Sequence, residues 1–180
     1  MELILVRHGE TEENVNKILL GHLNACLNKN GHSNSIEIAD RLKQEAISGI
    51  YTSDLLRAVQ SAGYIKRNHP TAYYQEDRHL RERDYGCFNG APFDVFLSEY
   101  KDESAFSRPQ NGESLYEFRK RIQDFYQEIS RIYNRKDKVI AITHAGVIVN
   151  LLSLIEGNPL DEIVMNCKWP INNELIRLNI

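Results

Sequence analysis

The order of hydrophobic segments predicts an α/β protein, a three-layer sandwich with a mainly parallel central sheet and helices on both faces. Short apolar runs typical of buried strands alternate with longer segments whose apolar residues recur at helical spacing. The runs Leu3–Val6 and Val139–Thr143 are almost uninterrupted, which is typical of strands buried within a parallel sheet. Alternating strands and helices of this kind connect by crossovers, and crossovers join parallel strands.

The first part of the chain predicts a strand, a loop, a helix and a second strand. After the strand at Leu3–Val6, the segment Asn14–Leu27 lacks a clear period and contains Gly21 and several asparagines, which is typical of a loop or a broken helix. Beyond Gly31, apolar residues at helical spacing predict an amphipathic surface helix: Ile36, Ala39, Leu42 and Ala46. Ile50–Thr52 then predicts a short strand.

The next helix is expected to start near Ser53 and Asp54, which offer an N-cap and an acidic residue in the first turn. Its inward residues are Leu55, Leu56, Val59, Ala62 and Ile65. Pro70 separates it from Thr71–Gln75, which favours β structure. Leu80–Gly90 is typical of a loop with glycine hinges.

The second half predicts a cover followed by two helices and two strands. Residues 91–112, with two prolines and mixed charge, are expected to cover the active site. The clearest helix follows, with inward residues Leu115, Phe118, Ile122, Phe125, Ile129 and Ile132. Its basic run Arg119–Arg121 indicates a solvated face. After the strand ending at Thr143, Val147–Ile155 predicts a helix that ends before Gly157, and Glu174–Ile180 predicts an edge strand.

Length and composition indicate one soluble globular domain covering residues 1–180. The chain is 42% hydrophobic and 26% charged, and its formal net charge is -3. A net negative charge argues against non-specific nucleic-acid binding, which requires a basic excess. No run reaches the ~18 apolar residues of a membrane helix, and Met1 leads directly into an acidic residue and a strand rather than a secretion signal. We therefore expect a cytoplasmic protein without a membrane partner.

The cysteines do not indicate a disulfide framework or a structural zinc site. Cys26, Cys87 and Cys167 are odd in number, far apart and without a Cys-x-x-Cys pair. We expect reduced thiols.

Arginines and histidines follow the predicted strands at the points where α/β proteins bind ligands. Arg7 and His8 follow the first strand, and His144 follows the strand that ends at Thr143. Arg57 falls in the first turn of its helix. Arginine matches two phosphate oxygens at once, so these residues predict a phosphate pocket. Two histidines there suggest that one attacks phosphorus while neutral and the other donates hydrogen bonds.

A proton donor for the leaving group is expected on the loop Leu80–Gly86, which carries Glu82 and Asp84. Glu82 is the expected general acid. Asp84 is the alternative. If neither acts in catalysis, Glu82 forms an ordinary surface ion pair with Arg81 or Arg83.

Taken together, these segments resemble the histidine phosphatase superfamily, the phosphoglycerate-mutase-like enzymes. The similar blocks occur in family order from residue 3 to about residue 152. They are Arg7-His8-Gly9-Glu10-Thr11 with Asn14, then Gly21 and Leu27, Thr52-Ser53-Asp54-Leu55-Leu56-Arg57-Ala58, Leu80-Arg81-Glu82-Arg83-Asp84-Tyr85-Gly86 with Gly90, Gly112-Glu113-Ser114, and Thr143-His144-Ala145-Gly146.

The resemblance implies a role for each matching residue. His8 would be the nucleophile that becomes phosphohistidine, and Glu82 would give a proton to the leaving group and later activate water. His144 would assist catalysis and bind the phosphoryl group, together with Arg7, Asn14, Arg57 and the backbone amide of Ala145. Gly21 and Tyr85 would contact the substrate. The family chemistry requires no metal and no cofactor.

The resemblance leaves three functions open. The first is a phosphatase acting on a small phosphorylated metabolite of the sugar phosphate or α-ribazole phosphate type. The second is a cofactor-dependent phosphoglycerate mutase, although mutases carry a longer basic segment where this chain has only Lys101 and Arg108. The third is a catalytically silent phospholigand-binding or protein-binding relative, which the presence of His8 and Glu82 argues against. Oligomeric state is not predicted.

Overall fold

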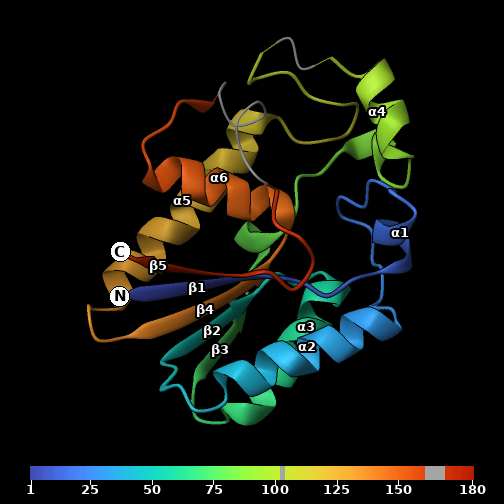
Figure 1. The fold of residues 1–180 in the computed structure, drawn as a ribbon. Helices are drawn as coiled ribbons and strands as arrows, with labels where there is room; N and C mark the ends of the chain where they lie inside the picture. The colour runs from blue at the N-terminus through green and yellow to red at the C-terminus, as the bar shows by residue number, and fades with distance from the viewer. Residues whose placement is uncertain (102–103, 161–168) are drawn as a thin grey trace.

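The structure, a computed structural model, describes residues 1–101, 104–160 and 169–180. A five-stranded sheet lies between two helical layers (Figure 1). Its strands are β1 (Glu2–Arg7), β2 (Gly49–Thr52), β3 (Tyr73–Glu76), β4 (Lys138–Thr143) and β5 (Leu175–Asn179), in the spatial order β3-β2-β4-β1-β5. All neighbouring pairs are parallel except β1 and β5. The predicted fold class is confirmed.

Helices cover both faces of the sheet. The longer ones are α2 (Lys29–Leu42), α3 (Leu56–Asn68), α5 (Leu115–Ile132) and α6 (Ala145–Ile155), and the shorter ones are α1 (Glu12–Val15), α4 (Phe93–Glu99) and the 3₁₀ turns η1 (Arg78–Leu80) and η2 (Gly86–Phe88). In Figure 1, α5 and α6 lie on one face and α2 and α3 on the other, while α1 and α4 lie beyond the carboxyl ends of the parallel strands.

Strand residues alternate between two hydrophobic cores because successive side chains point to opposite faces. Leu3, Leu5, Tyr51, Val139 and Ala141 pack with α5 and α6. Ile4, Val6, Ile50, Ile140 and Ile142 pack with α2 and α3. Burial on both faces explains why β1 and β4 are continuously apolar in the sequence.

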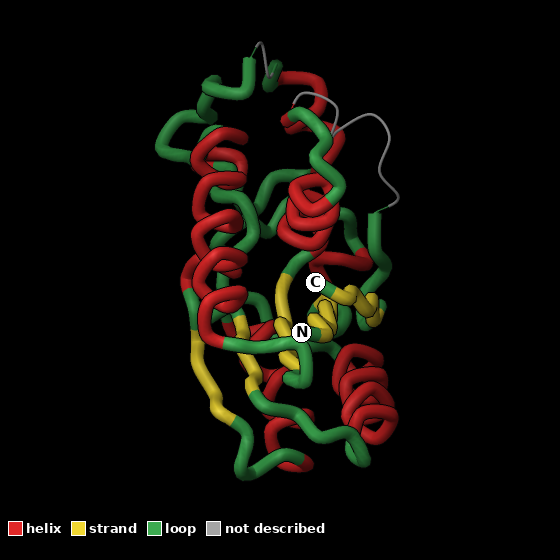
Figure 2. Tube along the Cα trace, turned by 90° about the vertical axis from the view of Figure 1, so that its left-hand side faces the viewer, coloured by secondary structure: helices red, strands yellow, loops and turns green. Residues whose placement is uncertain are grey.

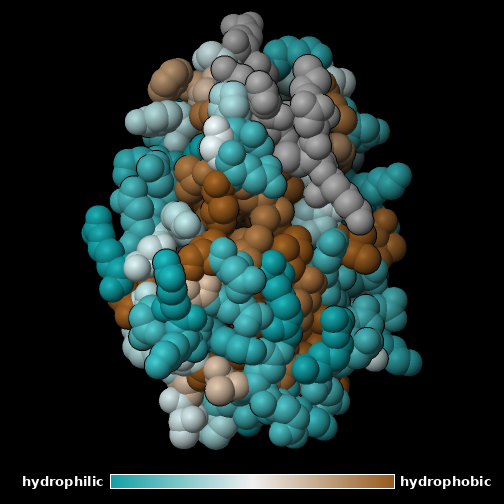
Figure 3. All heavy atoms as spheres, turned by 60° about the vertical axis from the view of Figure 1, so that its left-hand side comes forward, coloured by the Kyte–Doolittle hydropathy of each residue, from teal (hydrophilic) through white to brown (hydrophobic). Residues whose placement is uncertain are grey.

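The edge strand β5 brings the C-terminus back to the N-terminus. It pairs antiparallel with β1, and the Met1 amino group donates to the Ile180 carbonyl oxygen at 2.5 Å. The tube view of Figure 2 also places the two termini side by side. Figure 3 shows hydrophobic side chains gathered in the middle of one outer face, and partly buried residues of α6 and β5, including Ile155 and Ile176, pack against the core on that side of the sheet.

Two helix boundaries differ from the predictions. Helix α2 ends at Leu42, before the exposed Ala46, because the chain turns there into β2. Helix α3 begins at Leu56, with Leu55 as N-cap and no side-chain cap. Ser53 and Asp54 do not cap it because each has a partner elsewhere, His144 and Arg81 respectively. By contrast, Ser114 caps α5 in a capping box with Glu117.

The expected cover, residues 91–112, contains the short helix α4 and is not irregular throughout. Phe96 is the buried side of α4, and its ring contacts Tyr85, Phe88 and Tyr100 at centroid distances of 5.1, 5.5 and 5.3 Å. These aromatic contacts attach α4 to the loop that carries Glu82. Residues 102–103 of the segment lie outside the described part.

Candidate active site

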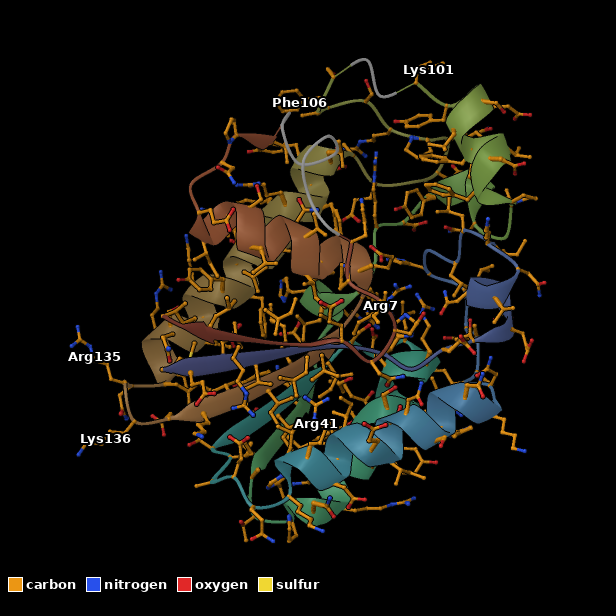
Figure 4. The ribbon with its side chains drawn as sticks, in the orientation of Figure 1. Arg7, Arg41, Lys101, Phe106, Arg135 and Lys136 are labelled. Carbon is orange, nitrogen blue, oxygen red and sulfur yellow. The ribbon has the colours of Figure 1, made fainter. Side chains whose placement is uncertain are left out.

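The register of the two central strands brings both histidines together. Arg7 lies opposite Thr143 in the parallel pair of β1 and β4, so both strands end at the same level. The His8 backbone N–H donates to the Thr143 carbonyl at 2.9 Å, and the rings of His8 and His144 lie 5.0 Å apart between centroids. Figure 4 shows Arg7 at this end of the sheet, while Arg135 and Lys136 project from the other end.

Backbone contacts determine which nitrogen of His8 is free. Nδ1 lies 2.7 Å from the Gly9 carbonyl oxygen, which can only accept, so Nδ1 carries the proton. In the neutral ring Nε2 is then the basic atom, and it accepts from Arg57 Nε at 3.2 Å. Burial, followed by the charges of Arg57 and Arg7, lowers the pKa of His8 well below its usual value. The result is a neutral imidazole with a lone pair among cations.

Arg57 is buried and Arg7 is partly buried, and no carboxylate among the described residues pairs with either of them. Arg57 is 1% exposed and donates to the carbonyl oxygens of Leu23 and Gly21 at 2.7 and 2.9 Å. Arg7 donates through Nη1 to Pro170, and its buried Nε has no hydrogen-bond partner in the described part of the chain. Burial lowers the pKa of both arginines, to about 10 for Arg57. Buried cations in this state favour an anionic ligand.

His144 is oriented by Ser53, the residue expected to cap α3. The His144 Nε2 lies 2.8 Å from the Ser53 hydroxyl oxygen. Its Nδ1 is buried and has no partner among the described residues. Burial, with the charge of Arg57 next, lowers the pKa of His144 well below its usual value. His144 is also the N-cap residue of α6, so the buried Ala145 that follows opens the helix with its amide near the site.

The Glu82 carboxylate is held by backbone amides and not by an arginine side chain. Its two oxygens accept from the N–H groups of Arg83 at 3.0 Å and Gly146 at 3.1 Å. A Cβ on Gly146 would lie 2.2 Å from Glu82 Oε1, so a glycine is needed there for this approach. In the described part of the chain, the ion pair considered as the alternative is not formed: Arg81 pairs with Asp54, and the Arg83 Nε donates to the Glu113 carbonyl oxygen.

Arg121, from the basic run expected to face solvent, organises the backbone of the Glu82 loop. It donates to the carbonyl oxygens of His79, Arg81 and Glu82 at 2.7, 2.6 and 2.8 Å. Its remaining N–H groups make a bidentate pair with Glu113 at 2.7 and 2.9 Å. Every N–H group of this guanidinium therefore has a partner. The expectation of a solvated face is wrong for Arg121, because α5 packs directly against η1 and the loop.

A cavity of about 490 Å³ opens over these groups and contains most of the predicted site residues. Its predicted lining residues are Arg7, His8, Asn14, Gly21, Arg57, Glu82 and Tyr85. His144 and Ala145 are buried beneath them and are not part of the lining. The sequence analysis missed further lining residues: Lys17, Ile18, Leu19, Leu20, Phe93, Trp169 and Asn172.

Asn172 shows why part of the site was missed. Its side-chain amide donates to the His8 carbonyl oxygen and to Asn14 Oδ1, both at 3.1 Å. Asn172 belongs to a turn before β5, more than 150 positions from Asn14. Nothing local in the sequence indicates that this turn folds back over the first strand.

The described residues contain no group of three or more histidine, cysteine or acidic side chains placed to hold a metal ion. Nor does any helix among them have the length and apolar character needed to cross a membrane. Cys26 and Cys87 are free and exposed, and Cys167 lies outside the described residues.

Comparison with known sequences and structures agrees with this geometry. The histidine phosphatase superfamily (branch 1) matches residues 3–172. Phosphoglycerate mutase-like protein 4 of Arabidopsis thaliana is 34% identical over 160 residues, which cover 83% of this chain and 69% of that protein. The metal-independent phosphoserine phosphatase of the same plant is 30% identical, covering 82% of this chain and 65% of that protein. A 2,3-bisphosphoglycerate-dependent phosphoglycerate mutase of Bartonella bacilliformis is 29% identical, covering 91% and 85%.

Solved structures share the fold at lower identity. Mycobacterial glucosyl-3-phosphoglycerate phosphatase superposes with a TM-score of 0.85 at 22% identity, covering 98% of this chain and 88% of the other. The α-ribazole phosphatase of Shigella flexneri superposes with a TM-score of 0.78 at 24% identity, covering 91% and 84%.

The three-layer α/β fold thus places two histidines and two arginines together at the carboxyl end of its parallel strands, an arrangement suited to an anionic ligand. More particularly, the chain belongs to the histidine phosphatase superfamily (branch 1).

Proposed function

We propose that the protein hydrolyses phosphomonoesters of small metabolites through a phosphohistidine on His8, without a metal ion. The observation that carries this proposal is the state of His8, a buried neutral imidazole whose basic Nε2 points to Arg57 and lines the cavity. A nucleophile for phosphorus needs a free lone pair and cations to hold the attacked group. Both are present in one place.

In the first step, Nε2 of His8 attacks phosphorus and the bond to the leaving oxygen breaks. The phosphoryl oxygens take hydrogen bonds from Arg7 and Arg57, from Asn14, from the Ala145 amide, and from Nδ1 of His144, which carries a proton in this role. This last assignment gives a partner to a buried atom that otherwise has none. Cations already in position stabilise the transferring group without reorganisation.

Glu82 supplies the proton that the leaving alkoxide takes up. In the second step its carboxylate accepts a proton from water, the water oxygen attacks phosphorus, and the bond to His8 breaks to release inorganic phosphate. Asp84 is unsuited to this role because, unlike Glu82, it does not line the cavity. Its carboxylate accepts instead from the Gly86 amide and the Asn89 side-chain amide at 2.9 and 2.7 Å. Burial opposes its ionisation, but those hydrogen bonds together with the charges of His22 and Arg121 hold the pKa of Asp84 below its usual value.

Hydrolysis is favoured over mutase activity by the position of the basic residues in the cover. A mutase must bind the acid group of phosphoglycerate as well as the phosphoryl group. Arg108 is paired with Glu117, and neither Arg108 nor Lys101 lines the cavity. Figure 4 shows Lys101 at the outer end of the segment, far from Arg7. We include residues 91–112 as the cover of a single domain over residues 1–180.

Rapid quench with ³²P-labelled substrate tests the proposal. The wild type should yield an acid-labile, alkali-stable phosphoryl group on His8, and His8→Ala should yield none. Equal labelling of both proteins would exclude His8 as nucleophile. With 3-phosphoglycerate and catalytic 2,3-bisphosphoglycerate, phosphate release should exceed isomerisation, and the reverse ranking would identify a mutase.

A pair of substrates tests Glu82. Glu82→Gln should slow hydrolysis of an alkyl phosphate by ~10²–10⁴-fold but spare p-nitrophenyl phosphate, whose leaving group departs as an anion. Asp84→Asn is the matched control and should change the ratio of the two rates little. An unchanged ratio in Glu82→Gln would remove it from the acid role, because a folding defect lowers both rates alike.

A further inference from the structure

The cavity has two chemically different ends. The reacting end is formed by Arg7, His8, Arg57 and Glu82. The rest of the lining combines a hydrophobic set, Ile18, Leu19, Leu20, Tyr85, Phe93 and Trp169, with Asn14, Lys17, Gly21 and Asn172. The leaving group must lie against this second part. The side-chain amide of Asn172 is already used by the His8 carbonyl oxygen and Asn14. None of the family blocks in the sequence accounts for the hydrophobic set, apart from Tyr85.

The hydrophobic wall is built into the fold. Ile18 and Pro92 form an isolated antiparallel bridge. On either side of it, the Leu19 N–H donates to Ala91 at 2.8 Å and the Phe93 N–H donates to the Lys17 carbonyl at 3.0 Å. These backbone bonds hold the start of the cover against residues 17–19. The wall is therefore fixed by the backbone of the fold.

Two large aromatic side chains of this wall remain open to solvent. Trp169 is 49% exposed and Phe93 is 47% exposed, and both line the cavity. Leu19 and Leu20 behind them are buried, at 8% and 7%. Aromatic surface held beside a phosphate site favours a ligand that covers it, since burying that surface is favourable.

Polar partners for the leaving group are few at this end. Lys17 is the single cation in the described lining outside the reacting end, and its side chain is exposed at the rim. A sugar placed against Ile18, Phe93 and Trp169 would lose hydrogen bonds from its hydroxyl groups to water without replacing them, which is costly. A second phosphate group would meet Lys17 alone.

We infer that the preferred substrates are phosphomonoesters whose leaving group presents an apolar or aromatic face, in preference to sugar phosphates and bisphosphates. This inference rests on the proposed phosphatase function and specifies its substrate class. Of the two types expected from the sequence, it favours the ester whose leaving group contains an aromatic ring over the sugar phosphate.

Two esters of equal shape test the inference. Cyclohexylmethyl phosphate and glucose 6-phosphate both carry a six-membered ring on a primary alkyl phosphate, so their leaving groups need a proton to a similar degree. The kcat/KM should be at least ~10-fold higher for cyclohexylmethyl phosphate, the range that a few methylene groups produce in an apolar pocket. Ethyl phosphate reports on the reaction without the ring, and fructose 1,6-bisphosphate reports on a second anionic group.

Variants of the wall locate the effect. Phe93→Ala and Trp169→Ala should each lower kcat/KM for cyclohexylmethyl phosphate by about 3- to 10-fold, and by clearly more than kcat/KM for ethyl phosphate, which carries no ring. Phe106→Ala is the matched control, because Phe106 lies in the same segment, is 69% exposed and does not line the cavity (Figure 4). It should change neither value.

The outcomes separate this inference from the proposed function. Equal or higher kcat/KM for glucose 6-phosphate or the bisphosphate would overturn the substrate class while leaving the phosphatase intact. An equal loss of kcat/KM for ethyl phosphate in Phe93→Ala would show that the wall acts on the reaction and not on the leaving group, which also overturns it. No phosphate release from any of the four esters, with no phosphohistidine on His8, would instead refute the phosphatase function.

Discussion

Charged side chains lie at both ends of the sheet, but they are paired with opposite charges at only one of them. At the amino end, Lys138 lies 2.7 Å from Glu45 and 3.3 Å from Glu2, and Arg177 pairs with the same two carboxylates. At the carboxyl end, Arg7 and Arg57 lie beside His8 and His144. One end is a network of paired ions, and the other is a buried cluster of cations and neutral imidazoles.

The pKa shifts follow this difference. The hydrogen bond from Arg177 outweighs burial and lowers the pKa of Glu45 to about 2, and hydrogen bonds to Glu45 and Glu2 raise the pKa of Lys138. At the other end burial lowers the pKa of Arg57 to about 10. Ion pairing therefore stabilises the charged forms of the residues at the amino end. Burial disfavours the charged forms of the arginines at the carboxyl end, and a bound anion would stabilise them. We conclude that the amino end serves stability and the carboxyl end serves ligand binding.

The largest difference between the two ends is expected in kcat/KM when one arginine is removed from each. Arg57→Gln should lower kcat/KM by ~10²–10³-fold, because a donor to the transferring phosphoryl group is lost. Arg177→Gln should leave kcat/KM within about twofold, since exposed ion pairs act on stability alone. Steady-state kinetics with p-nitrophenyl phosphate measures both. A comparable loss in the two variants would break the distinction between the ends.

Arg121 extends the reacting end to a residue outside the cavity. Arg121→Gln should slow an alkyl phosphate by about 10²-fold more than p-nitrophenyl phosphate, because a misplaced Glu82 affects only the ester that needs a proton. Arg121→Lys should restore only part of the ratio, as lysine cannot reproduce the bidentate pair with Glu113. Equal losses on both substrates would reduce Arg121 to a structural residue.

Gly146→Ala should also slow hydrolysis of an alkyl phosphate more than hydrolysis of p-nitrophenyl phosphate, by about 10-fold. The added Cβ displaces the end of the Glu82 side chain, which lies 2.2 Å from its position, while the helix α6 can retain its backbone. Thermal unfolding measures whether the fold is retained. A variant with the wild-type ratio would show that the Gly146 amide does not position Glu82.

The dependence of kcat/KM on pH below neutrality should reflect the cationic surroundings of His8. Burial and the charges of Arg57 and Arg7 lower the pKa of His8 below 6.5, so the ring stays neutral and nucleophilic as pH falls through that value. The kcat/KM for p-nitrophenyl phosphate should therefore not decline near pH 6.5, and an NMR titration should place the His8 midpoint lower. A midpoint at or above 6.5 would contradict the described environment.

The smallest effect is expected for the ion network. Glu45→Gln should lower the free energy of unfolding by ~1 kcal/mol or less at neutral pH. Because the pKa of Glu45 is lowered from 4.5 to about 2, its contribution is complete above 4.5 and is lost as pH falls toward 2. Urea unfolding at several pH values should show the wild type and the variant converging below pH 4.5. A constant difference would indicate packing instead of charge.

The sequence predictions succeeded for features that depend on local sequence and failed for residues whose partners are distant in the sequence. The strands at Leu3–Val6 and Val139–Thr143 and the helix at Leu115–Ile132 were predictable because their apolar period is a local property. Ser53 and Arg121 were misread, since a cap or a solvated face is the ordinary local use of such residues. Their partners, His144 and the Glu82 loop, lie 91 and 39 positions away.

Local sequence was thus sufficient for the α/β alternation, the residues at the strand ends and the family blocks that contain His8 and Glu82. The assembled chain was needed to set the strand register that joins His8 to His144, the Arg121 contacts that hold the Glu82 loop, and the hydrophobic wall with Trp169. The physical reason is that hydrophobic periodicity is encoded within one segment. Which polar group satisfies which partner depends on segments that meet only after folding.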